Sequence, residues 1–157
     1  MGDVATFPTI RNVLWSGKNL HGFTATSTIK AGMVVAFAAA GVSGAVIPAI
    51  NATSGQPIGV ALSDAAAGSK VTVACNGCIC YVANFSTTVA IDSGDVLEDK
   101  SNAIGGTVGL AALTSTAGGG VVGTVRYTVG IAIDKMAAST TGRMLVKCGA
   151  MTAPMTA

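Results

Sequence analysis

The sequence predicts an all-β fold, and three observations support this. Several short segments of the first half of the chain return in the second half in the same order. Half of the 157 residues are hydrophobic, yet only 4% are aromatic and 10% charged, so small apolar residues and 21 glycines dominate. About ten short apolar or alternating runs are separated by glycine-rich turns, which is typical of a small β-barrel or sandwich. The length suits one compact domain.

The duplicated segments predict two related β units. Each copy comprises a glycine-containing turn, a strand, a loop, a strand headed by glycine, and a closing strand. This is the pattern of a scaffold rather than of a catalytic site. The matched segments are Ile29–Val35 with Ile91–Leu97, Ile58–Leu62 with Val129–Ile133, and Gly68–Cys75 with Gly142–Cys148.

The strands follow one another from Ile29 onward, each bounded by turn residues. Helix is expected for at most one turn each, at 64–67 and 135–138. The second copy is lengthened mainly by a glycine-rich insertion at 103–120, which we expect to be an exposed loop. The expected strands are 33–37, 45–48, 58–62, 71–75, 78–83, 89–91, 96–98, 107–113, 121–127, 129–133 and 144–148.

Residues 1–28 differ from the rest and are expected to form an extended N-terminal arm. They hold large side chains set singly among polar ones, with no regular period: Phe7, Trp15, His21 and Phe23. Such anchors suit an arm that lies across another surface, each filling a pocket there. The alternative is an edge strand and a loop packed on the same domain. The β-barrel domain is then expected at 29–150 and a C-terminal tail at 151–157.

Composition argues against two classes of partner. The formal net charge is only +2, and Lys and Arg are scattered singly, so nucleic acid is not an expected partner. The uncharged run at 33–50 is long enough to span a bilayer, but its glycines, serine and proline argue against a membrane helix. Charge this sparse favours a chain that works in an assembly.

The four cysteines allow three interpretations: buried free thiols, a disulfide, or a metal site based on the Cys75–Cys78 spacing. Cys75 and Cys148 fall at matching places in the two copies, in strands that alternate with Val and Met, which favours small core residues. Cys80 lies two positions after Cys78, so both face the same side of an extended strand. We expect no metal.

No set of residues predicts catalysis. His21 is the only histidine, and no nucleophile or orienting partner is patterned around it, so it is expected at a surface or interface. Asp92, Asp95, Glu98 and Asp99 cluster, but without the spacing of a calcium loop, so a solvated turn is expected rather than an ion site. No catalytic residue and no cofactor is predicted.

Two motifs resemble a known family. Ala31-Gly32-Met33-Val34-Val35 matches its Ala-Gly-x-Val-Val turn and strand, and residues 59–73 match its Gly-Val-Ala-Leu-x-x-Ala-x-x-Gly-x-x-Val-x-Val segment. These are hallmarks of the small capsid decoration (cement) proteins of tailed bacterial and archaeal viruses. The resemblance covers roughly residues 29–150, more firmly in the first half. The cysteine-rich strand at 75–80 and the low charge depart from the family.

The resemblance implies a non-enzymatic virion protein with a β-barrel or β-tulip core and an N-terminal arm. It implies a homotrimer that binds the major capsid protein on the outer surface of the head and reinforces the shell after it expands. During assembly the protein is expected in the host cytoplasm. Two alternatives remain: another virion or surface structural protein, such as a tail or fibre component, and a small-molecule-binding β-clip domain.

Overall fold

The structure is a computed structural model, and it describes residues 12–38, 43–48, 56–84, 90–101, 108–112 and 125–152. The all-β prediction is confirmed: the described residues form eleven strands and no helix. The strands are β1 (Leu14–Ser16), β2 (Leu20–Ala25), β3 (Val34–Phe37), β4 (Ala45–Pro48), β5 (Pro57–Ala61), β6 (Lys70–Ala74), β7 (Ile79–Ala83), β8 (Val96–Ser101), β9 (Val108–Ala112), β10 (Val125–Ala132) and β11 (Thr141–Thr152).

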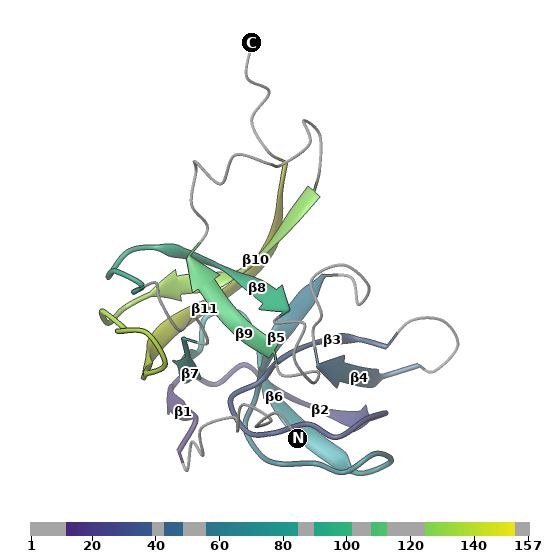
Figure 1. The fold of residues 1–157 in the computed structure, drawn as a ribbon. Helices are drawn as coiled ribbons and strands as arrows, with labels where there is room; N and C mark the ends of the chain where they lie inside the picture. Colours follow the sequence, from purple (N-terminus) through teal and green to yellow (C-terminus); the bar gives the residue numbers. More distant parts are fainter. Residues whose placement is uncertain are drawn as a thin grey trace, which may run out of the picture.

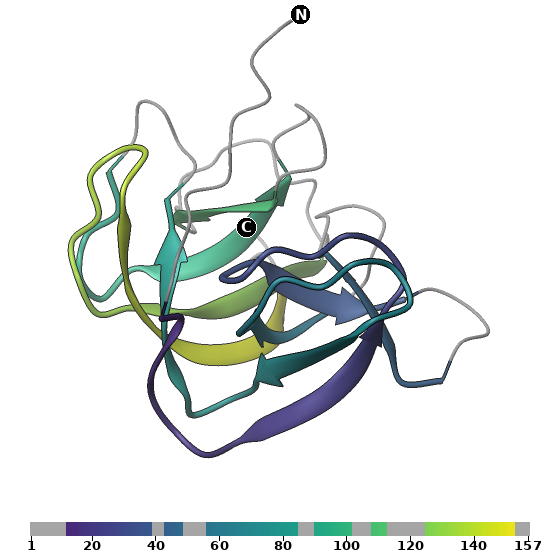
Figure 2. The same cartoon turned by 90° about the horizontal axis from the view of Figure 1, so that it is seen from below.

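The strands form a closed barrel and an open sheet (Figure 1). The barrel has the order β2-β4-β3-β5-β6 and is closed by parallel pairing of β2 with β4. The six-stranded sheet has the order β1-β7-β11-β10-β8-β9, with antiparallel pairing throughout. Figure 2 shows the same two groups from below. We call residues 20–74 the barrel unit and residues 79–152 the sheet unit.

The two units repeat each other strand for strand. In the barrel unit β2 pairs with β6, β6 with β5, β5 with β3 and β3 with β4. In the sheet unit β7 pairs with β11, β11 with β10, β10 with β8 and β8 with β9, in the same antiparallel sense. The difference lies at the closing edge. β4 pairs with β2, whereas the place beside β7 is taken by β1.

The matched glycines Gly59 and Gly130 both allow a neighbouring strand to approach closely. At Gly59 a Cβ would overlap the carbonyl oxygen of Ala74, and at Gly130 it would overlap that of Leu145. Only glycine lets the neighbouring strand come this close.

The two segments expected as one-turn helices, at 64–67 and 135–138, are instead extended loops. Each forms an isolated bridge to the turn of its own unit, Ile29 with Ala65 and Ile91 with Met136.

The proposed match of Cys75 with Cys148 is wrong. Val60 lies opposite Ala74, and its equivalent Ile131 lies opposite Leu145, so Cys75 corresponds to Val146. The shift arises at the preceding turn. Gly68 has a φ of 85° there, and its counterpart is Ser139, with a φ of 57°, not Gly142.

Two hydrophobic cores result. One fills the barrel interior and includes Val35, Val46 and Val73. The other joins the outside of the barrel to the inside of the sheet. It contains Val34, Val60 and Ala74 from the barrel unit together with residues of the sheet unit, chief among them Cys80, Leu97, Met136 and Met144.

The described part of residues 1–28 belongs to the two sheets. Leu14–Ser16 pairs with β7, and Leu20–Ala25 is a strand of the closed barrel. Both segments pair with a sheet because an edge strand has unpaired backbone N–H and C=O groups, and each segment supplies hydrogen-bonding partners for them. Residues 1–11, with Phe7, lie outside the described residues. At the other end β11 runs to Thr152, so the expected boundary at 150 falls within a strand.

The uncharged run at 33–50 contains β3 and β4. Across the described parts of the chain, no helix has the length and apolar content needed to cross a membrane. The described parts of the two strands expected at 121–127 and 129–133 belong to one strand, β10, whose register shifts between Thr128 and Gly130.

Candidate interaction surface

A line of apolar side chains crosses the outer face of the sheet unit. Ile79 lies opposite Leu145, Leu145 opposite Ile131, and Ile131 opposite Val96. All four side chains are only partly buried. Their chain neighbours Cys80, Met144, Ala132 and Leu97 are core residues, and side chains alternate along a strand, so the line faces away from the core. We call these four residues the outer line.

Three of the four residues in the equivalent line on the barrel unit are covered. The line consists of Leu20, Ala74, Val60 and Val34, which are paired across the strands in the same way. The last three are at most 2% exposed because they pack within the core shared with the sheet unit. The repeat therefore shows one such line largely buried within the chain and a second one accessible.

Trp15 stands at the edge of the same sheet and is 54% exposed. The guanidinium carbon of Arg143 lies 4.9 Å from the centre of its ring, a cation–π contact. Arg143 is held in turn by Asp134: Nε donates to Oδ2 at 2.8 Å and Nη2 to Oδ1 at 2.7 Å, while the Arg143 amide also donates to Oδ2 at 2.9 Å. These bonds lower the pKa of Asp134 to about 2 and raise that of Arg143.

The backbone that carries Trp15 is firmly anchored. Val13 is buried in the shared core, and its carbonyl accepts a hydrogen bond of 2.8 Å from the amide of Tyr81. At Gly17 a Cβ would lie 2.7 Å from the Cα of Cys78, so the chain there is packed closely against the start of β7. Trp15 is therefore an exposed indole on a fixed support, which is the usual character of an interface anchor.

His21 and Phe23 lie on β2 of the barrel unit rather than beside Trp15. The His21 ring lies 6.5 Å from that of Phe23, and Phe23 makes an edge-to-face contact of 5.7 Å with Phe37. The Nε2 of His21 is 2.8 Å from Oδ1 of Asn19. Phe37 is half exposed and was not singled out in the sequence. It stands at the end of β3 and joins this group through its ring contact with Phe23.

The cysteines are free thiols at the junction of the two units. Cys78 and Cys80 are fully buried in the shared core, as expected for small core residues. Burial raises the pKa of Cys80 and of Cys148 to about 12 and also raises that of Cys75. Within the described ranges, no group of His, Cys, Asp and Glu side chains is arranged to hold a metal ion.

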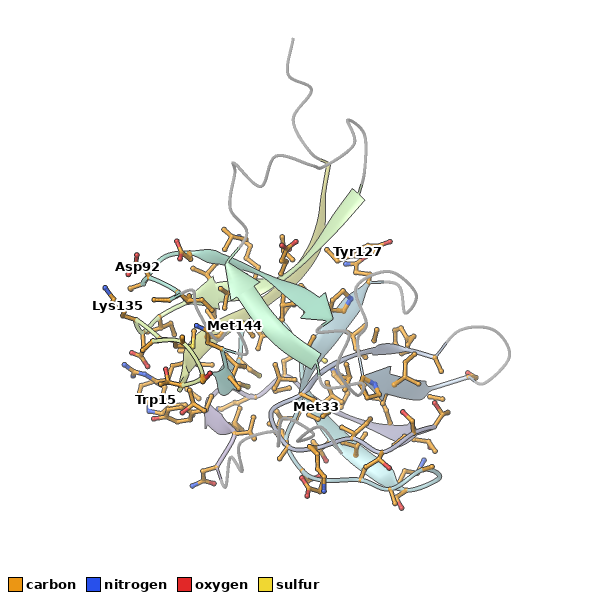
Figure 3. All side chains as sticks on the ribbon, viewed as in Figure 1. Trp15, Met33, Asp92, Tyr127, Lys135 and Met144 are labelled. Atoms are coloured by element: carbon orange, nitrogen blue, oxygen red, sulfur yellow. The ribbon has the colours of Figure 1, made fainter. Side chains whose placement is uncertain are left out.

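The acidic cluster makes turn and ion-pair contacts. Asp95 Oδ2 accepts a hydrogen bond of 2.9 Å from the amide of Asp92, and the Asp92 carboxylate lies 3.2 Å from Lys135 Nζ. Glu98 is buried. Figure 3 shows Asp92 and Lys135 next to one another, on the same side of the molecule as Trp15.

Comparison with known proteins gives a likeness of fold. No protein-family model matches the sequence, and no curated protein matches it either. Among solved structures, the fold is similar to the crystal structure of the head fiber gp8.5 N base in bacteriophage phi29. The TM-score is 0.53 at 19% sequence identity, over 82% of this chain and 92% of that one. At this identity the likeness is one of fold.

Proposed function

We propose that this chain is a structural protein of a phage head that binds the outer surface of the major capsid lattice, as a homotrimer, and reinforces it. The observation that carries the proposal is the fold likeness to a phage head fiber base, which extends over 82% of this chain and 92% of that one. The motif resemblance to capsid decoration proteins agrees with it independently.

The outer face of the sheet unit supplies the binding surface in this proposal. It joins a partly exposed apolar line to an exposed tryptophan that is fixed in place by Arg143 and Asp134. Apolar residues around a rigid aromatic anchor are what protein interfaces use for most of their binding energy. Identical copies around a rotation axis multiply such a contact, so weak binding by each copy suffices.

The test uses heads of the encoding phage that lack the protein. Purified protein is mixed with these heads and the bound fraction is measured by co-sedimentation. We expect Trp15→Ala to reduce affinity by about 30-fold or more, because truncation of an interface anchor costs about 2 kcal/mol or more. Thr72→Ala, on an exposed position of β6, is the control and should bind normally. Binding of Trp15→Ala with the same affinity as Thr72→Ala would show that this face is not the binding surface.

Phe23→Ala tests the second aromatic group in the same assay. Its binding defect, or the lack of one, decides whether the barrel unit also contacts the head. Sedimentation equilibrium of the free protein tests the trimer. A monomer at micromolar concentration would overturn a preassembled trimer.

A second function, the base of a head fibre, is favoured by the name of the structural neighbour. Both functions predict binding to the head surface. The two functions differ in their expected effect on the thermal stability of the head. A reinforcing protein should raise the temperature at which heads release DNA, whereas a fibre base should leave it unchanged and carry a projection visible by cryo-electron microscopy.

A further inference from the structure

Each unit closes on itself through a backbone contact that we call its clasp. In the barrel unit residues 29–33 dock on residues 61–65, and in the sheet unit residues 91–95 dock on residues 132–136. The hydrogen bonds repeat one for one. Ile29 and Ala65 exchange two bonds of 2.8 and 2.9 Å, and Ile91 and Met136 exchange two of 2.9 Å.

The next pair of bonds repeats as well. The amide of Gly32 donates to the carbonyl of Ala61 at 2.8 Å, as that of Gly94 does to the carbonyl of Ala132. Because the clasps offer the same donors and acceptors at the same spacing, backbone hydrogen bonding cannot distinguish the right partner from the wrong one. Residues 29–33 would find the same backbone pattern on residues 132–136.

The ion pair across each clasp breaks this equivalence. In the barrel unit Lys30 Nζ lies 3.2 Å from Asp64 Oδ2, and in the sheet unit Lys135 Nζ lies 3.2 Å from Asp92 Oδ1. Lys30 and Asp92 occupy the same place in the repeat, as do Asp64 and Lys135. The polarity is therefore reversed. A crossed clasp would bring Lys30 to Lys135 and Asp92 to Asp64.

We propose that this reversal directs each clasp to its own unit and disfavours crossed pairing, both within a chain and between two copies. Chains built from similar units misassemble by this kind of exchange. Repulsion in the wrong arrangement is an effective way to suppress it. Charges also act over several ångströms before side chains interlock, so they select the partner during the encounter, when packing differences such as Ala65 against Met136 do not yet count.

Two variants separate this proposal from a simple stabilising role. Asp92→Lys with Lys135→Asp keeps an ion pair in both clasps but gives them the same polarity, and it leaves the hydrogen bond from the Ala31 amide to Asp64 intact. Adding Lys30→Asp and Asp64→Lys restores opposite polarity in a four-fold variant. Each protein is refolded from urea at low salt, and the misassembled and dimeric fractions are measured by size-exclusion chromatography and native mass spectrometry.

The two-fold variant should melt close to wild type yet give about threefold to tenfold more misassembled product, since two like-charge contacts become attractive ones in the crossed form. The four-fold variant should return toward the wild-type fraction. The difference should vanish in 1 M salt. Equal refolding of wild type and the two-fold variant would overturn the proposal. A four-fold variant that melts like wild type yet misassembles as much as the two-fold one would also overturn it; the melting temperature is compared because Asp64→Lys removes the hydrogen bond from the Ala31 amide.

Discussion

Replacing Gly130 by alanine should destabilise the protein through one steric contact. The added methyl would overlap the carbonyl oxygen of Leu145 and lie 2.8 Å from Cγ and Sδ of Met144. Gly130 lies outside the left-handed region of φ, so alanine adds no backbone strain there. Overpacking a core costs about 1–3 kcal/mol, and a backbone carbonyl in a paired strand cannot move aside as a side chain can. We therefore expect a loss of about 3 kcal/mol.

Urea unfolding followed by far-UV circular dichroism measures this loss. With a slope of about 2 kcal/mol per molar urea, the midpoint should fall by about 1.5 M. Gly59→Ala should behave alike, because its methyl would overlap the carbonyl oxygen of Ala74. Gly22→Ala is the control: its methyl meets nothing within 4 Å, and the change should stay within about 1 kcal/mol. A Gly130→Ala midpoint equal to that of Gly22→Ala would refute the reasoning.

Three further predictions concern charge, thiols and packing. The carboxyl of Asp134 should titrate near pH 2 by NMR. Because its folded pKa lies below the usual value of 3.8, the stability that Asp134 contributes should be complete above about pH 5 and should decline as the pH falls from about 4 toward 2. The Asp134→Asn variant should lack this decline. An unshifted pKa of Asp134 would contradict the ion-pair geometry. Cys80, with its pKa raised to about 12, should react with iodoacetamide at pH 8 about a thousandfold more slowly than an unperturbed thiol, and rapid labelling of the native protein would show that it is not buried. Leu97→Ala should cost about 2–5 kcal/mol in thermal or urea unfolding, against less than about 1 kcal/mol for the more exposed Leu20→Ala, and equal losses would contradict the placement of Leu97 in the core.

Much of the fold follows from sequence pattern alone. The paired segments Ile29–Val35 and Ile91–Leu97 predicted two related units because their glycines and apolar positions must serve the same turn and strand. The structure bears this out down to individual hydrogen bonds. What the pattern could not predict is that one unit closes as a barrel and the other stays open, because closure depends on which strand takes the last edge.

The alignment of the closing strands failed for a definable reason. It relied on glycine identity, and the left-handed turn of the second unit is occupied by Ser139 instead. A serine in that conformation leaves no signal in the sequence. Glycine identity therefore aligns Gly142 with Gly68, and it aligns Cys148 with Cys75 in place of Val146. The two registers differ by two residues, so both leave the same side chains on the same face, and period-two alternation does not separate them.

The candidate surface was foreseen only in part. Trp15 stood out as the single tryptophan, but Arg143 and Asp134, which hold it, are nine positions apart on a hairpin that sequence could not place beside β1. The outer line was hidden for another reason. Its residues belong to runs that are apolar on both faces, and such runs do not indicate which face is covered.

Val34, Val60 and Ala74 of the barrel unit are buried under the sheet unit, so the stabilities of the two units are coupled through one core. Separating the units would expose this line and the interior of the open sheet at once, since both lie in one core. We therefore expect the two units to unfold together, because each gives up part of its buried apolar surface when the other unfolds. The repeat is modular in its sequence, whereas the shared core couples the stability of its two units.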